Sequence, residues 1–182
     1  YAVTGGVAKY VAQLMEEGCR TWEEMLVAVC RPSSIFLEEG TELLVGEFGR
    51  KYQIYYSILQ LIASGMTSQS EIDSVIGKNC GRYLDTLETE YSLIKKRRPM
   101  WAKPNSQGVK YYIDDCFLNF WFRFIESNLA PIIKSDGQTY ATYKTMFFGK
   151  DAFGVIDVEG GGLETIYKSR QEVGGPLEQV CT

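Results

Sequence analysis

The sequence predicts an α+β fold that is mainly α-helical, and the evidence lies in residues 53–113. Apolar residues recur at helical spacing in three successive segments there. Gly77 separates the second segment from the third and supplies the tight backbone that such a turn needs. A basic stretch over 94–113 has the turn residues of a strand-turn-strand hairpin. Three helices followed by a hairpin form the layout of a winged helix-turn-helix.

Four parts are therefore predicted along the 182-residue chain. Residues 1–48 are expected to be a helical lead-in, and residues 49–113 the winged helix-turn-helix. An aromatic helix and a linker follow over 114–137, and a β-rich tail over 138–182. A chain of this length suits one medium domain or two small ones.

Composition excludes several classes of function. Hydrophobic and charged contents of 45% and 23% are ordinary for a soluble globular protein, and the widely spaced cysteines favour a cytoplasmic one. No apolar run approaches the ~20 residues of a membrane span, so no membrane association is expected. Five cysteines without a CxxC pair favour reduced thiols, and the absence of histidine excludes Ser-His-Asp and histidine-metal catalysis. The net charge of −4 does not indicate nucleic-acid binding, so any such function must rest on local clustering.

The second predicted helix has a recognisable start and end. Ser68 precedes Glu71 by three residues, which is the spacing of a capping box. Ile72, Val75 and Ile76 are expected to face the core. Gly77 supplies the left-handed or tight backbone conformation that the turn after this helix needs.

The third predicted helix could present a polar face to DNA. Its apolar side contains Leu84 and Leu87, and four polar residues recur three or four positions apart on the other side. An ordinary solvated face is the alternative, because nearby carboxylates would repel phosphate. The polar residues are Asn79, Arg82, Thr86 and Thr89, and the carboxylates are Asp85, Glu88 and Glu90.

The hairpin, called the wing below, concentrates positive charge. Alternation along a strand sends neighbouring side chains to opposite faces, so its cations cannot all lie on one surface. They could nevertheless bind phosphates. Trp101 at the tip could stack on a base or pack on a neighbouring domain. The basic residues of the wing are Lys95, Lys96, Arg97, Arg98, Lys103 and Lys110.

Two other segments are expected to be structural. Residues 114–126 are dense in aromatics, with Asp114 or Asp115 as the helix cap, and should be buried or docked on another domain. Glu38 and Glu39 are neighbours in sequence and so do not form a catalytic pair on a helix. A solvated face is expected for both.

These stretches together resemble the C-terminal half of a prokaryotic, archaeal-type ATPase family, in which an AAA-type ATP-binding domain precedes a winged helix. The matching motifs are TGGVAKYV (4–11), FLEEGTELLVGEF (36–48), YYSILQLIASGMTSQSEI (55–72), YLDTLE (83–88), the 99–101 turn and YYIDDCFLNFWFRFI (111–125). The resemblance implies that residues 1–48 end the ATPase lid or linker. ATP and magnesium would bind only the upstream domain, because no GxxxxGK[ST] motif occurs here. The family's nuclease-like Glu-x-Lys cluster is also absent.

The tail resembles a segment of tailed-phage major capsid proteins. FGKDAFGV (148–155) and the GGPL turn (174–177) carry this likeness. It implies a structural segment without catalytic residues. An artificial or mis-joined fusion near 135–138 explains the change of character best, and a genuine mobile-element protein is the alternative. Such a tail should pack poorly by itself, and limited proteolysis should cut between Ser135 and Tyr143.

The function expected from these observations is non-catalytic binding of double-stranded DNA by part of an ATPase. The alternatives are a protein-interaction or lid module, with the aromatic helix and Trp101 docked on the upstream ATPase domain, or a phage-derived structural fusion. No cofactor or metal is expected in this chain. The predicted DNA-binding residues are Asn79, Arg82, Thr86, Lys95, Lys96, Arg97, Arg98, Lys103 and Lys110.

Overall fold

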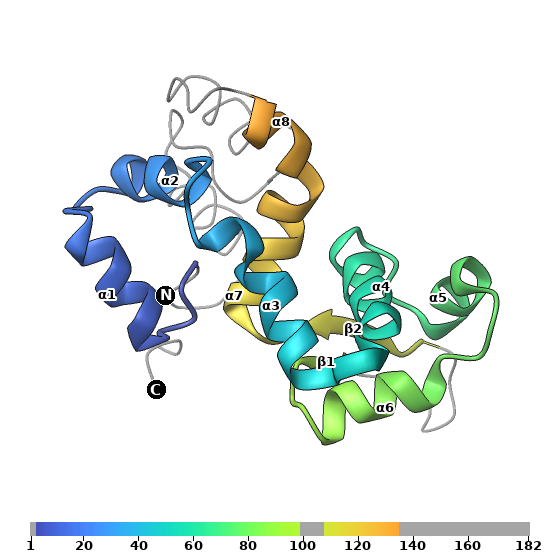
Figure 1. Cartoon of the computed structure of the whole chain (residues 1–182). Helices are drawn as coiled ribbons and strands as arrows, with labels where there is room; N and C mark the ends of the chain where they lie inside the picture. Colours follow the sequence, from blue (N-terminus) through green and yellow to red (C-terminus); the bar gives the residue numbers. More distant parts are fainter. Residues whose placement is uncertain (1–2, 99–107, 135–182) are drawn as a thin grey trace, which may run out of the picture. The chain divides into compact units, whose positions relative to one another are not determined.

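The computed structural model describes residues 3–98 and 108–134 and shows an α+β fold that is mainly helical (Figure 1). The chain divides into two units, 1–137 and 138–182. The following description concerns the first unit. The predicted β-rich tail, and Trp101 and Lys103 in the wing, lie outside the described residues.

Three helices precede the predicted DNA-binding block. They are α1 (Ala8–Glu16), α2 (Trp22–Cys30) and α3 (Phe36–Phe48). A capping box between Thr21 and Glu24 starts α2, and Gly49 ends α3. The polypeptide then turns through the short 3₁₀ segment Gly49–Lys51.

Helices α4 (Tyr52–Ala63), α5 (Gln69–Ile76) and α6 (Gly81–Thr89) follow as predicted. The capping box of Ser68 and Glu71 is confirmed, and Gly77 has a left-handed φ of 76°. The inward orientation expected of Val75 is wrong, because its side chain is 58% exposed. A short helix has only a narrow apolar stripe, so Ile72 alone of the three is fully buried. The core between the helices consists of Tyr55, Ile58, Leu59, Ile62, Ile72, Leu84 and Leu87.

The wing is a two-stranded antiparallel sheet of β1 (Ile94–Arg97) and β2 (Lys110–Ile113). Ile94 pairs with Ile113, and Lys96 pairs with Tyr111. The isoleucines and Tyr111 are buried, which identifies the inner face of the wing. Its outer face carries Lys95, Arg97, Lys110 and Tyr112.

The aromatic segment begins with α7 (Cys116–Phe120), which Asp115 caps by accepting a 2.7 Å hydrogen bond from the Leu118 amide. A π-helical turn (Trp121–Ile125), a 3₁₀ turn (Glu126–Asn128) and α8 (Leu129–Lys134) complete the described chain. The aromatic side chains of this segment lie in the core of this chain: Phe117, Phe120, Trp121, Phe122 and Phe124.

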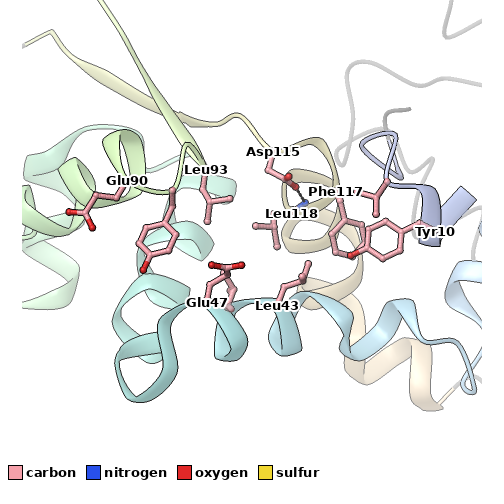
Figure 2. Close-up of a pocket in the computed structure, with 11 residues that line it drawn as sticks. Tyr10, Leu43, Glu47, Glu90, Leu93, Asp115, Phe117 and Leu118 are labelled. Carbon is pink, nitrogen blue, oxygen red and sulfur yellow. Dashed lines mark hydrogen bonds between the residues drawn. The ribbon is translucent and has the colours of Figure 1, made fainter.

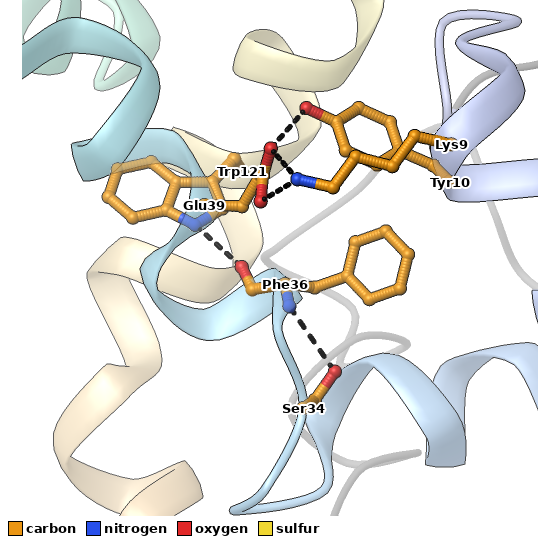
Figure 3. A network of polar contacts seen from close by, with 6 residues as sticks. All are labelled: Lys9, Tyr10, Ser34, Phe36, Glu39 and Trp121. Atoms are coloured by element: carbon orange, nitrogen blue, oxygen red, sulfur yellow. Dashed lines mark hydrogen bonds and ion pairs between the residues drawn. The ribbon is translucent and has the colours of Figure 1, made fainter. Parts of the chain in front are cut away.

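Helix α3 anchors this aromatic core. The Trp121 indole Nε1 donates a 2.9 Å hydrogen bond to the Phe36 carbonyl (Figure 3). Beside it, Glu39 is 6% exposed, so the expected solvated position of this carboxylate is wrong. Its oxygens accept 2.8 Å hydrogen bonds from Lys9 Nζ and a 3.0 Å bond from the Tyr10 hydroxyl. These partners, which come from α1, compensate the buried charge.

Two further findings concern the described part of the chain. None of its helices is long and apolar enough to cross a membrane. Four of its cysteines are free thiols: Cys19, Cys30, Cys80 and Cys116.

Candidate nucleic-acid interface

The outer face of the wing gathers three of the predicted cations. Lys95, Arg97 and Lys110 share it with Tyr112, and the Arg97 guanidinium lies 5.2 Å from the Tyr112 ring centroid. Such a contact orients the arginine without consuming its hydrogen-bond donors. This face could therefore offer a positioned guanidinium between two lysines.

Both of those lysines already have acidic partners. Lys95 pairs with Asp114, and Lys110 lies 3.7 Å from a Glu71 carboxylate oxygen. All four side chains are close to half exposed. Surface pairs of this kind are worth only about 0–1 kcal/mol, so a phosphate can compete for either lysine at modest cost.

Lys96 behaves differently, because strand alternation turns it to the inner face. Its Nζ pairs with Asp85 at 3.3 Å and also with Glu88, both on α6. The Lys96 backbone amide donates a 3.2 Å hydrogen bond to Glu88 as well. The hydrogen bond with Glu88 raises the pKa of Lys96 more than burial lowers it. Lys96 thus joins the wing to α6 and is not presented to solvent as a free cation.

The polar face of α6 is uneven. Arg82 is exposed and has no hydrogen bond or ion pair with another described side chain. Asn79 precedes the helix, and its Oδ1 accepts a 3.0 Å hydrogen bond from the Gly81 amide. Thr86 is half-buried and donates to Glu90 at 3.3 Å. Of these three predicted contacts, Arg82 is the best placed to reach a ligand.

Lys78 is a further cation near this interface that the sequence patterns did not indicate as a DNA contact. It is exposed immediately before Asn79, and its Nζ lies 4.9 Å from the Tyr83 ring centroid. Its place in the turn between two predicted helices, directly after Gly77, could have drawn attention to it. Lys78 and Arg82 together put positive charge at the start of α6, where the helix dipole also favours anions.

The remaining predictions have simpler outcomes. Arg98 is exposed at the end of β1, while Lys103 lies outside the described residues. Within residues 3–98 and 108–134, no group of three acidic or cysteine side chains is arranged to hold a metal ion.

Comparisons with known proteins give one informative result. An uncharacterized protein of Methanocaldococcus jannaschii is 31% identical over 114 residues. The match covers 61% of this chain and 26% of that protein, so this chain spans about a quarter of the relative's length. No family model matches the chain, and no solved structure matches it.

Proposed function

We propose that residues 49–113 form a winged helix-turn-helix that binds double-stranded DNA. The observation that carries this proposal is the distribution of charge. These residues include ten basic and five acidic side chains, a net charge of +5, whereas the whole chain has −4. The remainder therefore has a net charge of −9. Local positive charge in an otherwise acidic chain favours a polyanionic partner for this block.

The arrangement of the elements supports the same function. Helices α4, α5 and α6 precede the hairpin, and the left-handed Gly77 lies between the two helices of the turn. Three carboxylates of α6 and its end, Asp85, Glu88 and Glu90, are expected to repel phosphate. The pairing of Asp85 and Glu88 with Lys96 compensates part of that negative charge. The start of α6 and the outer face of the wing then remain as the positive surfaces.

Contacts to the DNA backbone should dominate this binding. Lys95, Arg97 and Lys110 are placed along one strand pair, as phosphate-binding cations need to be. Arg82 is the residue proposed to reach a base edge or a phosphate from α6. Because the middle of α6 is occupied by the Lys96 ion pairs, we expect limited discrimination between DNA sequences.

The test is fluorescence anisotropy of the full chain with a labelled duplex at about 50 and 200 mM salt. Arg82→Gln combined with Arg97→Gln should weaken binding about tenfold or more and reduce its salt dependence. Arg20→Gln is the matched control, because Arg20 is exposed but lies outside the proposed block. No binding at low salt, or an equal loss in the control, would contradict the proposal.

An ATPase parent remains part of this proposal. The sequence resemblance favours it, and the length of the M. jannaschii relative leaves room for further domains in that protein. ATP and magnesium would belong to such an upstream domain. The alternative of a docking module is less favoured, because the aromatic side chains of residues 117–124 that it would use are buried in this chain. The capsid-like fusion concerns residues outside those described.

A further inference from the structure

A cleft lined by residues other than the proposed DNA contacts has a distinct chemistry. It has a volume of about 410 Å³ and lies between α3, the end of α6 and the start of α7 (Figure 2). Its apolar lining includes Leu43, Leu93 and Leu118. Aromatic rings of Tyr10, Tyr91 and Phe117 also line it.

The charged groups that line this cleft are all acidic. They are Glu47, Glu90 and Asp115, and none of its lining residues is a lysine or an arginine. Glu47 forms no ion pair with any described side chain. Glu90 accepts a hydrogen bond from Thr86, and Asp115 caps α7. Carboxylates beside apolar walls favour a cation, because the low-dielectric walls weaken the screening of their field.

The surrounding sequence reinforces this preference. Residues 1–48 contain three basic and eight acidic side chains, a net charge of −5. The region beside the cleft is thus opposite in charge to the proposed DNA-binding block. A polyanion would be repelled where a basic partner would be attracted.

An apolar stripe leads away from the cleft along α1. Val7 lines the cleft, and Val11 and Met15 follow at intervals of four residues on the same side of the helix. Their side chains are 43%, 39% and 71% exposed. An amine or guanidinium ligand alone would not use this stripe. A chain segment that carries apolar side chains as well as a cation would use both surfaces.

We propose that the cleft and the α1 stripe bind a basic amphipathic segment of a partner protein. A lysine or arginine enters the cleft, with its aliphatic stem on the leucines and its charged head beside Glu47, while Glu90 adds negative charge at the edge of the lining. Apolar residues three or four positions along the same partner helix cover Val11 and Met15. This binding is independent of the DNA proposal, since the two use different residues.

The probe is a fluorescein-labelled arginine–leucine peptide of ~14 residues with helical amphipathicity, added to the full chain in anisotropy titrations. Glu47→Gln combined with Glu90→Gln should weaken its binding roughly three- to tenfold. Val11→Ser combined with Met15→Ser should weaken it as well, because apolar contact is lost. Asp115 is left unchanged, since its loss would uncap α7.

Glu42→Gln is the matched control, because Glu42 is an exposed carboxylate on α3 that does not line the cleft. Thermal melts confirm that each variant folds. DNA binding should not weaken in the cleft variants, because they remove no cation and Glu90→Gln removes a carboxylate that repels phosphate. An equal loss of peptide binding with Glu42→Gln would overturn the proposal. So would equal binding of spermine or of an arginine–serine peptide, because neither supplies apolar side chains. Failure to bind DNA would leave this result intact.

Discussion

The Trp121 indole lies directly against Gly40 in the middle of α3. A methyl group at Gly40 would come closer than 3 Å to three ring atoms, a separation that real side chains essentially never show. Glycine here is therefore required by packing, because its backbone is ordinary helix. The contact joins two segments more than 80 residues apart in sequence.

Gly40→Ala should consequently lower the free energy of unfolding by about 1–3 kcal/mol, the usual cost of overpacking a core. Gly46→Ala is its control in the same helix, where an added methyl group meets open space. That change should stabilise the protein by about 0.5–1 kcal/mol through helix propensity. Urea denaturation measures both. Equal effects at the two positions would show that Trp121 can move aside.

Stability should decline at alkaline pH. Burial first, and then the hydrogen bond to Glu39, raise the pKa of the Tyr10 phenol well above its usual range. Burial and Glu126 raise the pKa of Tyr56 in the same direction. A raised pKa means that the folded state favours the protonated phenol. The contribution of the two protonated phenols to the stability of the folded state is complete below about pH 10, the pKa of tyrosine in the unfolded chain. It is lost as the pH rises beyond that value.

Melting temperatures measured across this range should therefore fall less steeply for Tyr10→Phe than for the wild type. Phenylalanine keeps the ring but has no proton to lose. Tyr112→Phe, at an exposed position on the wing, is the control and should follow the wild-type curve. If the melting temperatures of the wild type and of Tyr10→Phe fall equally with rising pH, Tyr10 does not contribute to the loss of stability at alkaline pH.

Ser92 has a left-handed φ of 54°, unusual among non-glycine residues of the described chain. This conformation costs roughly 1 kcal/mol with a side chain, whereas glycine adopts it freely. Ser92→Gly should therefore be neutral or slightly stabilising, although the more flexible unfolded chain offsets part of the gain. Ser92→Val should be clearly destabilising because it is β-branched. A lower melting temperature for the glycine variant than for the valine variant would contradict this account.

Lys96 should affect DNA binding indirectly. Lys96→Met leaves Asp85 and Glu88 uncompensated beside the proposed interface, so affinity for the duplex should drop about fivefold or more. Adding Asp85→Asn and Glu88→Gln should restore most of that affinity. A direct phosphate contact by Lys96 would instead leave the triple variant as weak as the single one. If Lys96, Asp85 and Glu88 act as a unit, the changes in binding free energy from the separate substitutions will not add up to that of the triple variant.

The sequence predicted correctly those structural features that depend only on neighbouring residues. The Ser68–Glu71 capping box, the left-handed Gly77 and the cap at Asp115 each depend on a few neighbouring residues. Strand alternation also predicted correctly that the wing cations divide between two faces. Helix periodicity was less exact, as the exposure of Val75 shows.

Long-range pairings could not be predicted in this way. Glu39 is buried because Lys9 and Tyr10, 30 and 29 residues away, meet it from another helix. Alternation predicts only that Lys96 lies on the opposite face from Lys95 and Arg97. Its inward position and its partners Asp85 and Glu88 depend on how the wing packs against α6. The acidic cleft brings together residues from separate helices, and no local motif indicates it.

The pairing of β1 with β2 also determines which charges the wing can display. Because side chains alternate, a shift of β1 by one residue would exchange the inward and outward side chains of that strand. Lys95 and Arg97 would then be buried against the helices, and Lys96 would leave its carboxylates for solvent. Inserting a single alanine after Ile94 thus changes no charged residue yet turns Lys95 and Arg97 inward, so that Lys96 and Lys110 become the cations of the outer face.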